Sequence, residues 1–217
     1  MMRGVYIICE GHTEKEFVNS VLRPYFNNYQ IYDVRPILMS TGKSQKGGDI
    51  KFDRLKLNIE TLLKHNNDII VSTLIDFYKL KSDFPKYELA LKINNKIKRV
   101  DFLENSLAEV INNHRFNPYI QLHEFEALVF SSIGGFASIG TVNFKLLNKT
   151  FNSYPNPEDI NENPLTSPSN RLKEIIQGYD KINHGIMIIR ETGIKTIINK
   201  CPRFSKWVET LIKKVKE

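Results

Sequence analysis

The sequence predicts an α/β fold, in which a mostly parallel sheet is flanked by helices and is followed by a C-terminal helical segment. Two observations support this prediction. Short apolar runs rich in β-branched residues alternate along the chain with stretches of helical period. The apolar runs are also continuous, which is typical of strands buried on both faces of a parallel sheet. Alternating strands and helices of this kind place helices on both faces of the sheet.

The first elements are predicted to be a strand, a tight turn and a helix. Val5–Cys9 is apolar and β-branched, and it stops at Glu10-Gly11. Thr13 and Glu16 have the spacing of a capping box, which indicates a helix start. Pro24 should bend or end that helix, because proline lacks the backbone N–H that a helix interior needs.

The alternation continues through the middle of the chain. Strands are expected at 31–39, 68–76 and 119–122, and helices at 50–65 and at about 88–114, the latter with a break near Val100. The polar, glycine-bearing segment 41–49 predicts a loop. It lacks the glycine spacing of a Walker motif, so we do not expect a nucleotide-binding loop there.

Three segments are expected: an α/β core over 1–150, a linker or loop rich in Pro, Asn and Ser over 151–169, and a basic helical segment over 170–217. The last segment holds 11 basic and 5 acidic side chains, and therefore most of the net charge of +7. It should contain short helices at 171–177, 185–189, 194–199 and 204–215. Such an excess of positive charge is found on surfaces that bind nucleic acid, although lysines on helices often serve only solvation.

Composition narrows the class of protein. Of 217 residues, 41% are hydrophobic and 25% charged, as in a folded domain and unlike a disordered chain. No apolar run approaches the roughly 20 residues that cross a bilayer, and Met1–Glu10 lacks a signal-peptide cleavage pattern. We therefore expect a cytoplasmic protein with no membrane partner. Cys9 and Cys201 have neither metal-ligand nor disulfide-framework spacing, so both are expected to be buried thiols.

Acidic residues follow three of the predicted strands: Glu10, Asp76, and the pair Glu124 and Glu126. Ligands of open α/β sheets bind at the carboxyl ends of the strands. Carboxylates gathered there repel one another unless a cation neutralises them, and a site of oxygen ligands alone favours Mg²⁺ or Mn²⁺. Any one of these acids taken alone is more often a helix cap or a solvated turn. Gly11 strengthens the set, since glycine lets the chain turn sharply and leaves room for a metal or phosphate.

Basic side chains of the C-terminal segment are candidates for contact with a phosphate. Lys181 and His184 are the candidates near a leaving group, together with Arg171. A surface helix or a helix cap explains them about as well. His123 is expected to be a core residue rather than a ligand, and Trp207 to pack in the core rather than stack on bases.

The sequence resembles a known prokaryotic family, domain of unknown function 4276, along nearly its whole length. The resemblance lies in these pieces: Glu10-Gly11-His12-Thr13-Glu14, Leu74-Ile75-Asp76-Phe77-Tyr78, Phe84-Pro85, Gln121-Leu122-His123-Glu124-Phe125-Glu126-Ala127-Leu128 and Cys201-Pro202-Arg203-Phe204-Ser205-Lys206-Trp207. The strand ending in Glu-Gly and the later strand ending in Asp76 also resemble the TOPRIM domain of topoisomerases, primases and overcoming-lysogenization-defect (OLD) nucleases.

The resemblance implies a TOPRIM-like metal site. Glu10 would be a ligand or general base and Asp76 a second ligand, while Tyr78 occupies the place of a second aspartate. Glu124 or Glu126 would then have to supply the missing oxygen, Asp83 being a less favoured substitute. Relatives of this type often act beside an ATPase in phage defence, so an ATPase is an implied partner.

Three functions follow from these observations. The first is a nuclease dependent on Mg²⁺ or Mn²⁺, in which Glu10, Asp76 and Glu126 bind the metal and Glu124 and Lys181 join them in catalysis. In it, Gly11, Arg171 and His184 contact DNA or RNA. The second is a non-catalytic module that binds nucleic acid or a partner ATPase. A phosphotransferase or primase-like enzyme is disfavoured, because no convincing glycine loop for a nucleotide is present.

Overall fold

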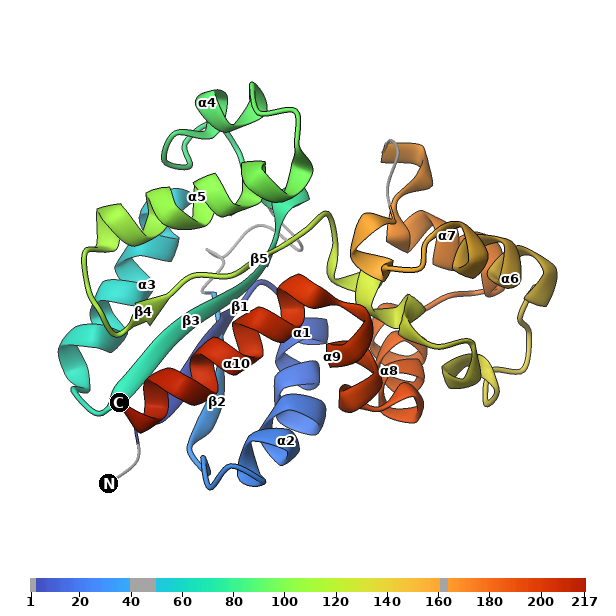
Figure 1. Ribbon diagram of the computed structural model, residues 1–217, viewed down its shortest axis with the longest axis horizontal. Coiled ribbons are helices and arrows are strands. Elements are labelled where there is room, and N and C mark those ends of the chain that lie inside the picture. Colours follow the sequence, from blue (N-terminus) through green and yellow to red (C-terminus); the bar gives the residue numbers. More distant parts are fainter. Residues whose placement is uncertain (1–2, 40–49, 161–163) are drawn as a thin grey trace.

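The computed structural model describes residues 3–39, 50–160 and 164–217, and the predicted loop 41–49 lies outside this part. A parallel sheet with strand order β2-β1-β3-β4 forms the centre of the molecule, and β5 pairs with the end of β3 (Figure 1). The strands are β1 (Gly4–Cys9), β2 (Val34–Leu38), β3 (Ile69–Asp76), β4 (Phe116–Asn117) and β5 (Ile120–Gln121). The predicted α/β fold with a parallel sheet is therefore confirmed.

Helices cover both faces of this sheet (Figure 1). Side chains alternate along β1, so that Val5 and Ile7 join one buried cluster while Tyr6 and Ile8 join the other. The first cluster includes α1 (His12–Phe17), α2 (Arg23–Asn27) and α10 (Pro202–Lys216), and the second includes α3 (Phe52–His65) and α5 (Lys96–Ile111). β1 and β3 lie in the middle and are buried along their whole length, which explains their continuous apolar sequence.

The first helix differs from the prediction at both of its ends. It begins at His12, and the carboxylate of Glu14, not Glu16, accepts the Gly11 N–H at 2.9 Å. It also continues past Pro24 to Asn27, through the wide turn η1 (Val18–Leu22). Pro24 stands at the start of α2, in the first turn after η1. The helix therefore does not end at Pro24, but its regular pattern of hydrogen bonds changes to a wide turn just before the residue that has no N–H to donate.

The predicted helix over 88–114 is two helices, α4 (Tyr87–Leu91) and α5, and the break lies before Asn95, not near Val100. Asn95 Oδ1 accepts the N–H of Lys98 at 2.9 Å, which caps α5. Val100 is fully buried inside α5. The side-chain amide of Asn95 therefore sets where α5 begins, and the spacing of apolar residues in the sequence does not predict this boundary.

Polar side chains connect β3 to the broken strand pair β4 and β5. Pro118 separates these two strands, and proline has no N–H to donate to a ladder. Thr73 Oγ1 replaces the missing bonds, since it donates to Tyr119 O and accepts from Tyr119 N, each at 2.8 Å. Ser72 Oγ donates to Asn117 O at 2.6 Å and accepts from Trp207 Nε1 at 2.8 Å. Trp207 also stacks on Tyr119 at 4.5 Å, so its predicted place in the core is confirmed.

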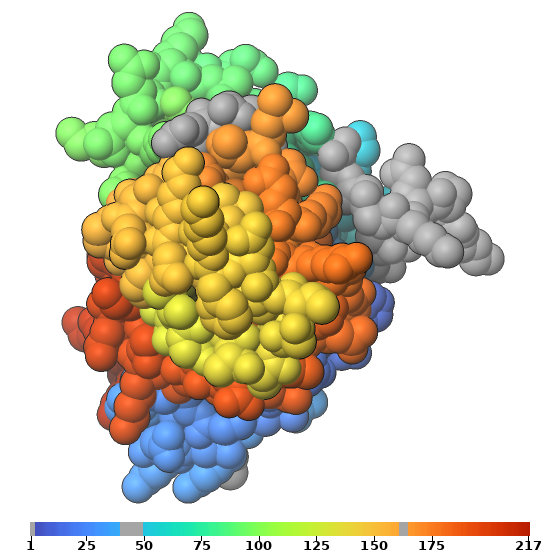
Figure 2. Space-filling model, turned by 90° about the vertical axis from the view of Figure 1, so that its right-hand side faces the viewer, coloured from blue at the N-terminus to red at the C-terminus, as the bar shows by residue number. Residues whose placement is uncertain are grey.

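The chain beyond β5 forms the right-hand part of the molecule before α10 returns to the sheet (Figure 1). Figure 2 shows this end, where elements from the middle of the chain (yellow) and α7 to α8 (orange) form the surface. Its short helices are η3 (Phe125–Ser131), η4 (Ile133–Phe136), α6 (Phe144–Ser153), η5 (Pro157–Asp159), η6 (Pro164–Thr166), α7 (Pro168–Ile175), η7 (Lys181–Gly185), α8 (Ile186–Thr192) and α9 (Ile194–Lys200). Gly193 and Pro202 separate α8, α9 and α10 as predicted, and Gly193 has a positive φ of 77°. The division at 151–169 stays a prediction.

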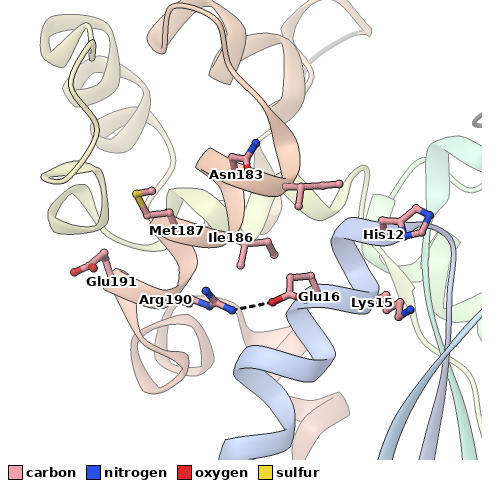
Figure 3. Close-up of a pocket in the computed structure, with 9 residues that line it drawn as sticks. His12, Lys15, Glu16, Asn183, Ile186, Met187, Arg190 and Glu191 are labelled. Carbon is pink, nitrogen blue, oxygen red and sulfur yellow. Dashed lines mark hydrogen bonds and ion pairs between the residues drawn. The ribbon is translucent and has the colours of Figure 1, made fainter.

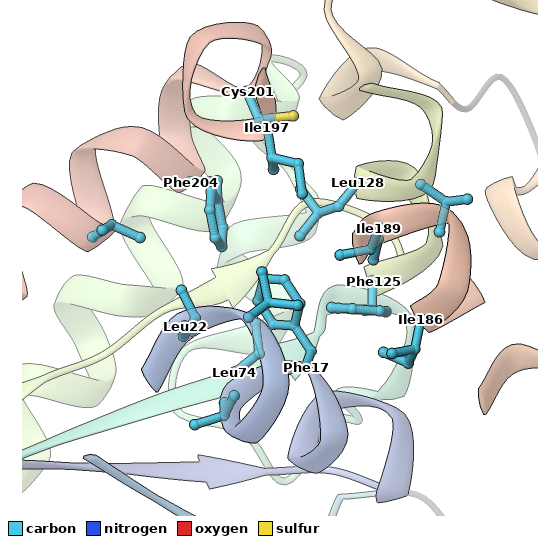
Figure 4. Close-up of a cluster of buried hydrophobic side chains, with 14 of the residues drawn as sticks. Phe17, Leu22, Leu74, Phe125, Leu128, Ile186, Ile189, Ile197, Cys201 and Phe204 are labelled. Carbon is cyan, nitrogen blue, oxygen red and sulfur yellow. The ribbon is translucent and has the colours of Figure 1, made fainter. Parts of the chain in front are cut away.

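One apolar cluster joins this end of the molecule to the sheet. Figure 4 shows Phe17 of α1, Leu74 of β3 and Phe125 of η3 packed with residues of α8, α9 and α10. Phe17 and Phe125 meet edge to face, with their ring centroids 5.1 Å apart. This packing fixes η3 and α8 against the carboxyl ends of β1 and β3. Cys9 and Cys201 are buried free thiols, as expected. Among the described residues, no helix is both long enough and apolar enough to span a bilayer.

Candidate functional site

Glu10 and Asp76 lie side by side at the carboxyl edge of the sheet. β1 and β3 are parallel neighbours with Cys9 opposite Leu74, so the residues that follow them emerge together. The backbone N–H of Asp76 donates to Glu10 Oε2 at 3.4 Å, and Lys79 Nζ lies 3.8 Å from Glu10 Oε1. Asp76 is buried, and its Oδ1 accepts the N–H of Phe125 at 2.8 Å. The bond from Phe125 ties η3 to the end of β3.

Glu126 and Lys181 form an ion pair beside these two acids. Glu126 is the second residue of η3 and is only 1% exposed, whereas half of the Lys181 side chain is exposed at the start of η7. The Lys181 ammonium contacts Glu126 Oε1. Glu126 Oε2 is buried and has no hydrogen-bond partner among the described residues. A buried carboxylate oxygen without a partner is costly, so this oxygen is available to a ligand.

Glu14 is a fourth carboxylate of the same cluster, which we call the acid cluster (Glu10, Glu14, Asp76 and Glu126). Glu14 is buried on α1, where its Oε2 accepts the Gly11 N–H. The sequence pattern does not single it out as a site residue, because the predicted capping motif lies two residues too late. The available signal is its position four residues after Glu10, which puts it one helical turn beyond the end of β1.

The charges of the acid cluster act on one another. Burial raises the pKa of Asp76 well above its ordinary value, and the charges of Glu10, Glu14 and Glu126 raise it further. Burial and the charge of Glu14 raise the pKa of Glu10 from 4.5 to about 7, although Lys79 acts in the opposite direction. Burial lowers the pKa of Lys181, but the Glu126 carboxylate outweighs this effect, and the pKa of that ammonium is raised overall. The cluster therefore favours whatever brings it positive charge, which is a proton or a cation.

The acid cluster fits a hard divalent cation by its chemistry, since all of its donors are carboxylate oxygens. The unpartnered Glu126 Oε2 is such a donor. Across 3–39, 50–160 and 164–217, however, no three His, Cys, Asp or Glu side chains are arranged as a set that could hold a metal ion. The cation in contact with Glu126 is instead the Lys181 ammonium. The structure thus brings the charges together without forming a complete ligand shell.

The other predicted site residues have partners elsewhere. Glu124 Oε2 accepts the N–H of Ser169 at 2.9 Å, so this carboxylate caps α7. Arg171 donates to Thr166 O at 2.9 Å and to the Tyr154 hydroxyl at 3.2 Å. His184 Nδ1 accepts the N–H of Asp180 at 3.0 Å. Each of these contacts ties a local turn or helix.

Two residues beside the cluster belong to its walls. Tyr78 lies with its ring centroid 5.6 Å from that of His123. His123 is buried and has a positive φ of 72°, and its carbonyl oxygen accepts the N–H of Tyr78 at 3.3 Å. Burial, followed by the charges of Lys96 and Arg99, lowers the pKa of His123 to about 4. A neutral, packed histidine agrees with the expected core role.

A groove of about 660 Å³ opens next to the acid cluster, between α1 and the pair η7 and α8 (Figure 3). His12 and Lys15 line it from α1, and Ile182 and Met187 line it from the opposite side. Arg190 Nη2 and Glu16 Oε1 form an ion pair across it at 2.8 Å. His12 follows Gly11 and Ile182 follows Lys181, so both walls of this groove include chain neighbours of residues at the acid cluster.

The chain was compared with known proteins. Among solved structures it is similar to the C-terminal region of the OLD protein of Xanthomonas campestris pv. campestris, with 12% identity and a TM-score of 0.49 over 98% of this chain and 92% of that one. No curated protein matches it. The model of the family described as "Domain of unknown function (DUF4276)" matches residues 9–212. The predicted family is thereby confirmed, and the chain belongs to the DUF4276 family.

Proposed function

We propose that this protein is a nuclease that hydrolyses phosphodiester bonds of DNA or RNA with the help of Mg²⁺ or Mn²⁺. The observation that carries the proposal is the acid cluster, in which Glu10 follows β1 and accepts the N–H of Asp76, and the charges of Glu10, Glu14 and Glu126 all act on Asp76, with the amine of Lys181 in contact with Glu126. Burying several carboxylates together destabilises the fold, so stability does not explain why they are there. Perturbed carboxyl groups gathered at the carboxyl edge of a parallel sheet are typical of a functional site.

The residues divide into two roles in this proposal. Glu10, Asp76 and Glu126 would hold the cation, and Glu14 is a further oxygen donor in the same cluster. When bound, a divalent cation activates water and stabilises charge on a phosphodiester. Lys181 would place its ammonium against a phosphate oxygen and stabilise the negative charge that develops there. Gly11 keeps the approach open, since the Glu14 carboxylate is the only group of the described residues within 4 Å of where its side chain would begin, its chain neighbours apart.

The groove beside the cluster offers a path for the substrate (Figure 3). His12 and Lys15 stand at the end next to Gly11, where they would face the phosphates that flank the scissile bond. Glu124, Arg171 and His184, which have local partners, contribute in this proposal mainly by holding η3, α7 and η7 in place. An ATPase partner and a role in phage defence remain predictions from the family resemblance stated above.

A non-catalytic module is the second candidate, and two observations favour it. Tyr78 stands where the TOPRIM domains that the sequence resembles carry a second aspartate. Lys181 already neutralises Glu126. In this alternative the acid cluster stabilises a docking surface, and the protein binds nucleic acid or an ATPase without cleaving anything.

Conservative substitutions separate the two candidates. Purified wild type, Glu10→Gln and Asp76→Asn are incubated with labelled single-stranded and double-stranded DNA and RNA, in Mg²⁺, in Mn²⁺ and in EDTA. Asn keeps an oxygen that can accept the Phe125 N–H, so Asp76→Asn retains the bond to η3. Glu60→Gln is the matched control, because Glu60 is exposed on α3, where it pairs with Lys56 at 3.8 Å.

The nuclease proposal expects cleavage that depends on the divalent ion, falls at least a hundredfold in both site variants and persists in Glu60→Gln. Cleavage that is equal in all four proteins would identify a contaminating activity and overturn the proposal. Wild type that binds these polymers but never cleaves them would instead establish the non-catalytic module.

A further inference from the structure

Tyr179 has a buried hydroxyl that the proposed chemistry does not use. Its Oη is inaccessible to solvent and has no hydrogen-bond partner among the described residues. Leaving such a group unpaired is costly, whereas phenylalanine would fill the same space without that cost. A tyrosine at this position therefore indicates that the hydroxyl has a polar partner other than the described protein groups.

The backbone directs Tyr179 and Lys181 to the same side. Asp180, between them, is extended, with φ −119° and ψ 128°. In an extended segment, residues i and i+2 point the same way. Since Lys181 contacts Glu126, the Tyr179 ring lies on the side of the chain that faces Glu126. The charge of Glu126 is, after burial, the largest influence that raises the pKa of Tyr179, which agrees with this placement.

Gly185 leaves room for the hydroxyl. A Cβ at Gly185 would lie 2.9 Å from Tyr179 Oη, whereas the next Tyr179 atom, Cζ, would be 3.9 Å away. The Tyr179 hydroxyl is therefore the group that requires residue 185 to have no side chain. The Gly185 backbone is ordinary right-handed helix, at φ −59° and ψ −48°, so glycine is not required here for its conformation.

Two buried groups of complementary type thus face the same side of the chain and have no hydrogen-bond partner among the described residues: a hydroxyl donor on Tyr179 and the Glu126 Oε2 acceptor. A water molecule satisfies both, because it accepts from a hydroxyl and donates to a carboxylate, and buried waters commonly serve polar groups that lack protein partners. We propose that Tyr179 is a positioning residue, whose hydroxyl, through one bound water, fixes the Glu126 carboxylate in the orientation that faces Lys181 and the other acids. The catalytic consequence rests on the proposed nuclease function, but the placement of the water and of Glu126 does not.

Three variants test this inference: Tyr179→Phe, Gly185→Ala and the double variant. Tyr154→Phe is the matched control, because its hydroxyl accepts a hydrogen bond from Arg171 outside the acid cluster. High-resolution crystal structures of wild type and Tyr179→Phe, grown without divalent ions, give the position of the water and of Glu126. Thermal unfolding and, in Mg²⁺, kcat and KM are measured for all variants.

In the wild-type crystal we expect one ordered water within hydrogen-bond distance of both Tyr179 Oη and a Glu126 oxygen. In Tyr179→Phe, this water should be lost and the Glu126 side chain displaced. Tyr179→Phe removes the water-bridged partner of the Glu126 carboxylate, and Tyr154→Phe removes an acceptor of Arg171, so both should unfold below the wild-type temperature. Only Tyr179→Phe should displace Glu126. A direct bond between Tyr179 and Glu126, or an unmoved Glu126 in Tyr179→Phe, would overturn the inference.

The kinetic measurements use the same variants. Loss of one hydrogen bond to a charged group predicts a kcat lower by about tenfold or more in Tyr179→Phe, with KM little changed. Gly185→Ala should reduce kcat in the wild-type background and have no further effect in the Tyr179→Phe background, since only the hydroxyl meets the new Cβ. Equal effects of Gly185→Ala in both backgrounds contradict the inference. A wild-type enzyme that cleaves nothing contradicts the proposed nuclease and leaves the crystallographic and stability arms to decide the role of Tyr179.

Discussion

Replacing Glu10 with glutamine should make the protein more stable at pH 8. Glu10 has a pKa of about 7 in the folded protein, against an ordinary value of 4.5. The folded state therefore holds this proton more tightly than the unfolded state does between these two values. Stability then falls as the pH rises from about 4.5 to about 7 and stays low above that range. The ionised Glu10 is unfavourable to the fold because it is largely buried beside Glu14.

The magnitude follows from the two pKa values. Their difference corresponds to about 3 kcal/mol at pH 8 and to less than about 1 kcal/mol at pH 5. The glutamine that replaces Glu10 is neutral at every pH, and its amide oxygen can still accept the Asp76 N–H. For a chain of 217 residues, about 3 kcal/mol raises the midpoint of thermal unfolding by about 6 to 12 °C.

Urea denaturation at pH 5 and at pH 8, in EDTA, measures this difference, with Glu60→Gln as the surface control. The reasoning is wrong if Glu10→Gln is no more stable than wild type at pH 8, or if its advantage is the same at both pH values. Mg²⁺ adds a second measurement. If the acid cluster binds the ion, Mg²⁺ should raise the unfolding temperature of wild type at pH 8 more than that of Glu10→Gln.

Three further substitutions test the contacts that support the site. Thr73→Val keeps the shape of the side chain but leaves the buried N–H of Tyr119 unpaired. Urea denaturation should therefore show a free energy of unfolding lower by about 1–3 kcal/mol. Unchanged stability would contradict the role of Thr73 between β3 and β5. Trp207→Phe removes the bond to Ser72 and part of the ring, for an expected loss of about 1–2 kcal/mol in the same assay, and unchanged stability would show that α10 does not depend on this contact. Glu158 accepts the N–H groups of Arg203 and Phe204 at 2.9 and 3.1 Å, and so caps α10. Glu158→Ala should therefore lower the free energy of unfolding by about 1–2 kcal/mol and increase hydrogen exchange in the first turn of α10. Unaltered exchange there would refute the capping role.

The sequence was sufficient for the elements that carry the sheet. Val5–Cys9 and 68–76 are continuous apolar runs, and both are the central strands of a parallel sheet, as the pattern indicates. The acids that end these strands could be predicted to meet, because neighbouring parallel strands end at one edge. Glu10 and Asp76 do meet there.

Other features depend on contacts that no local pattern reveals. Glu124 and Glu126 are two residues apart and equivalent in sequence, yet the first accepts a bond from Ser169 and the second is buried against Lys181. The path of the backbone at the start of η3 directs these two side chains differently. That path is fixed by the hydrogen bond from the Phe125 N–H to Asp76, which is 49 residues away in the sequence. In the same way, the Asn95 cap and not the apolar period decides where α5 begins.

Because α10 returns across the sheet at the end of the chain, the parts of the acid cluster and its surroundings are synthesised at different times. Translation delivers the acids of β1, α1 and β3 early, whereas Lys181 and the helix that carries Trp207 follow much later. Until they arrive, β3 lacks its cover of α10 and the acids lack their amine. A ribosome-bound chain that ends before these residues therefore cannot yet form the ion pair between Lys181 and Glu126 or the bond from Trp207 to Ser72.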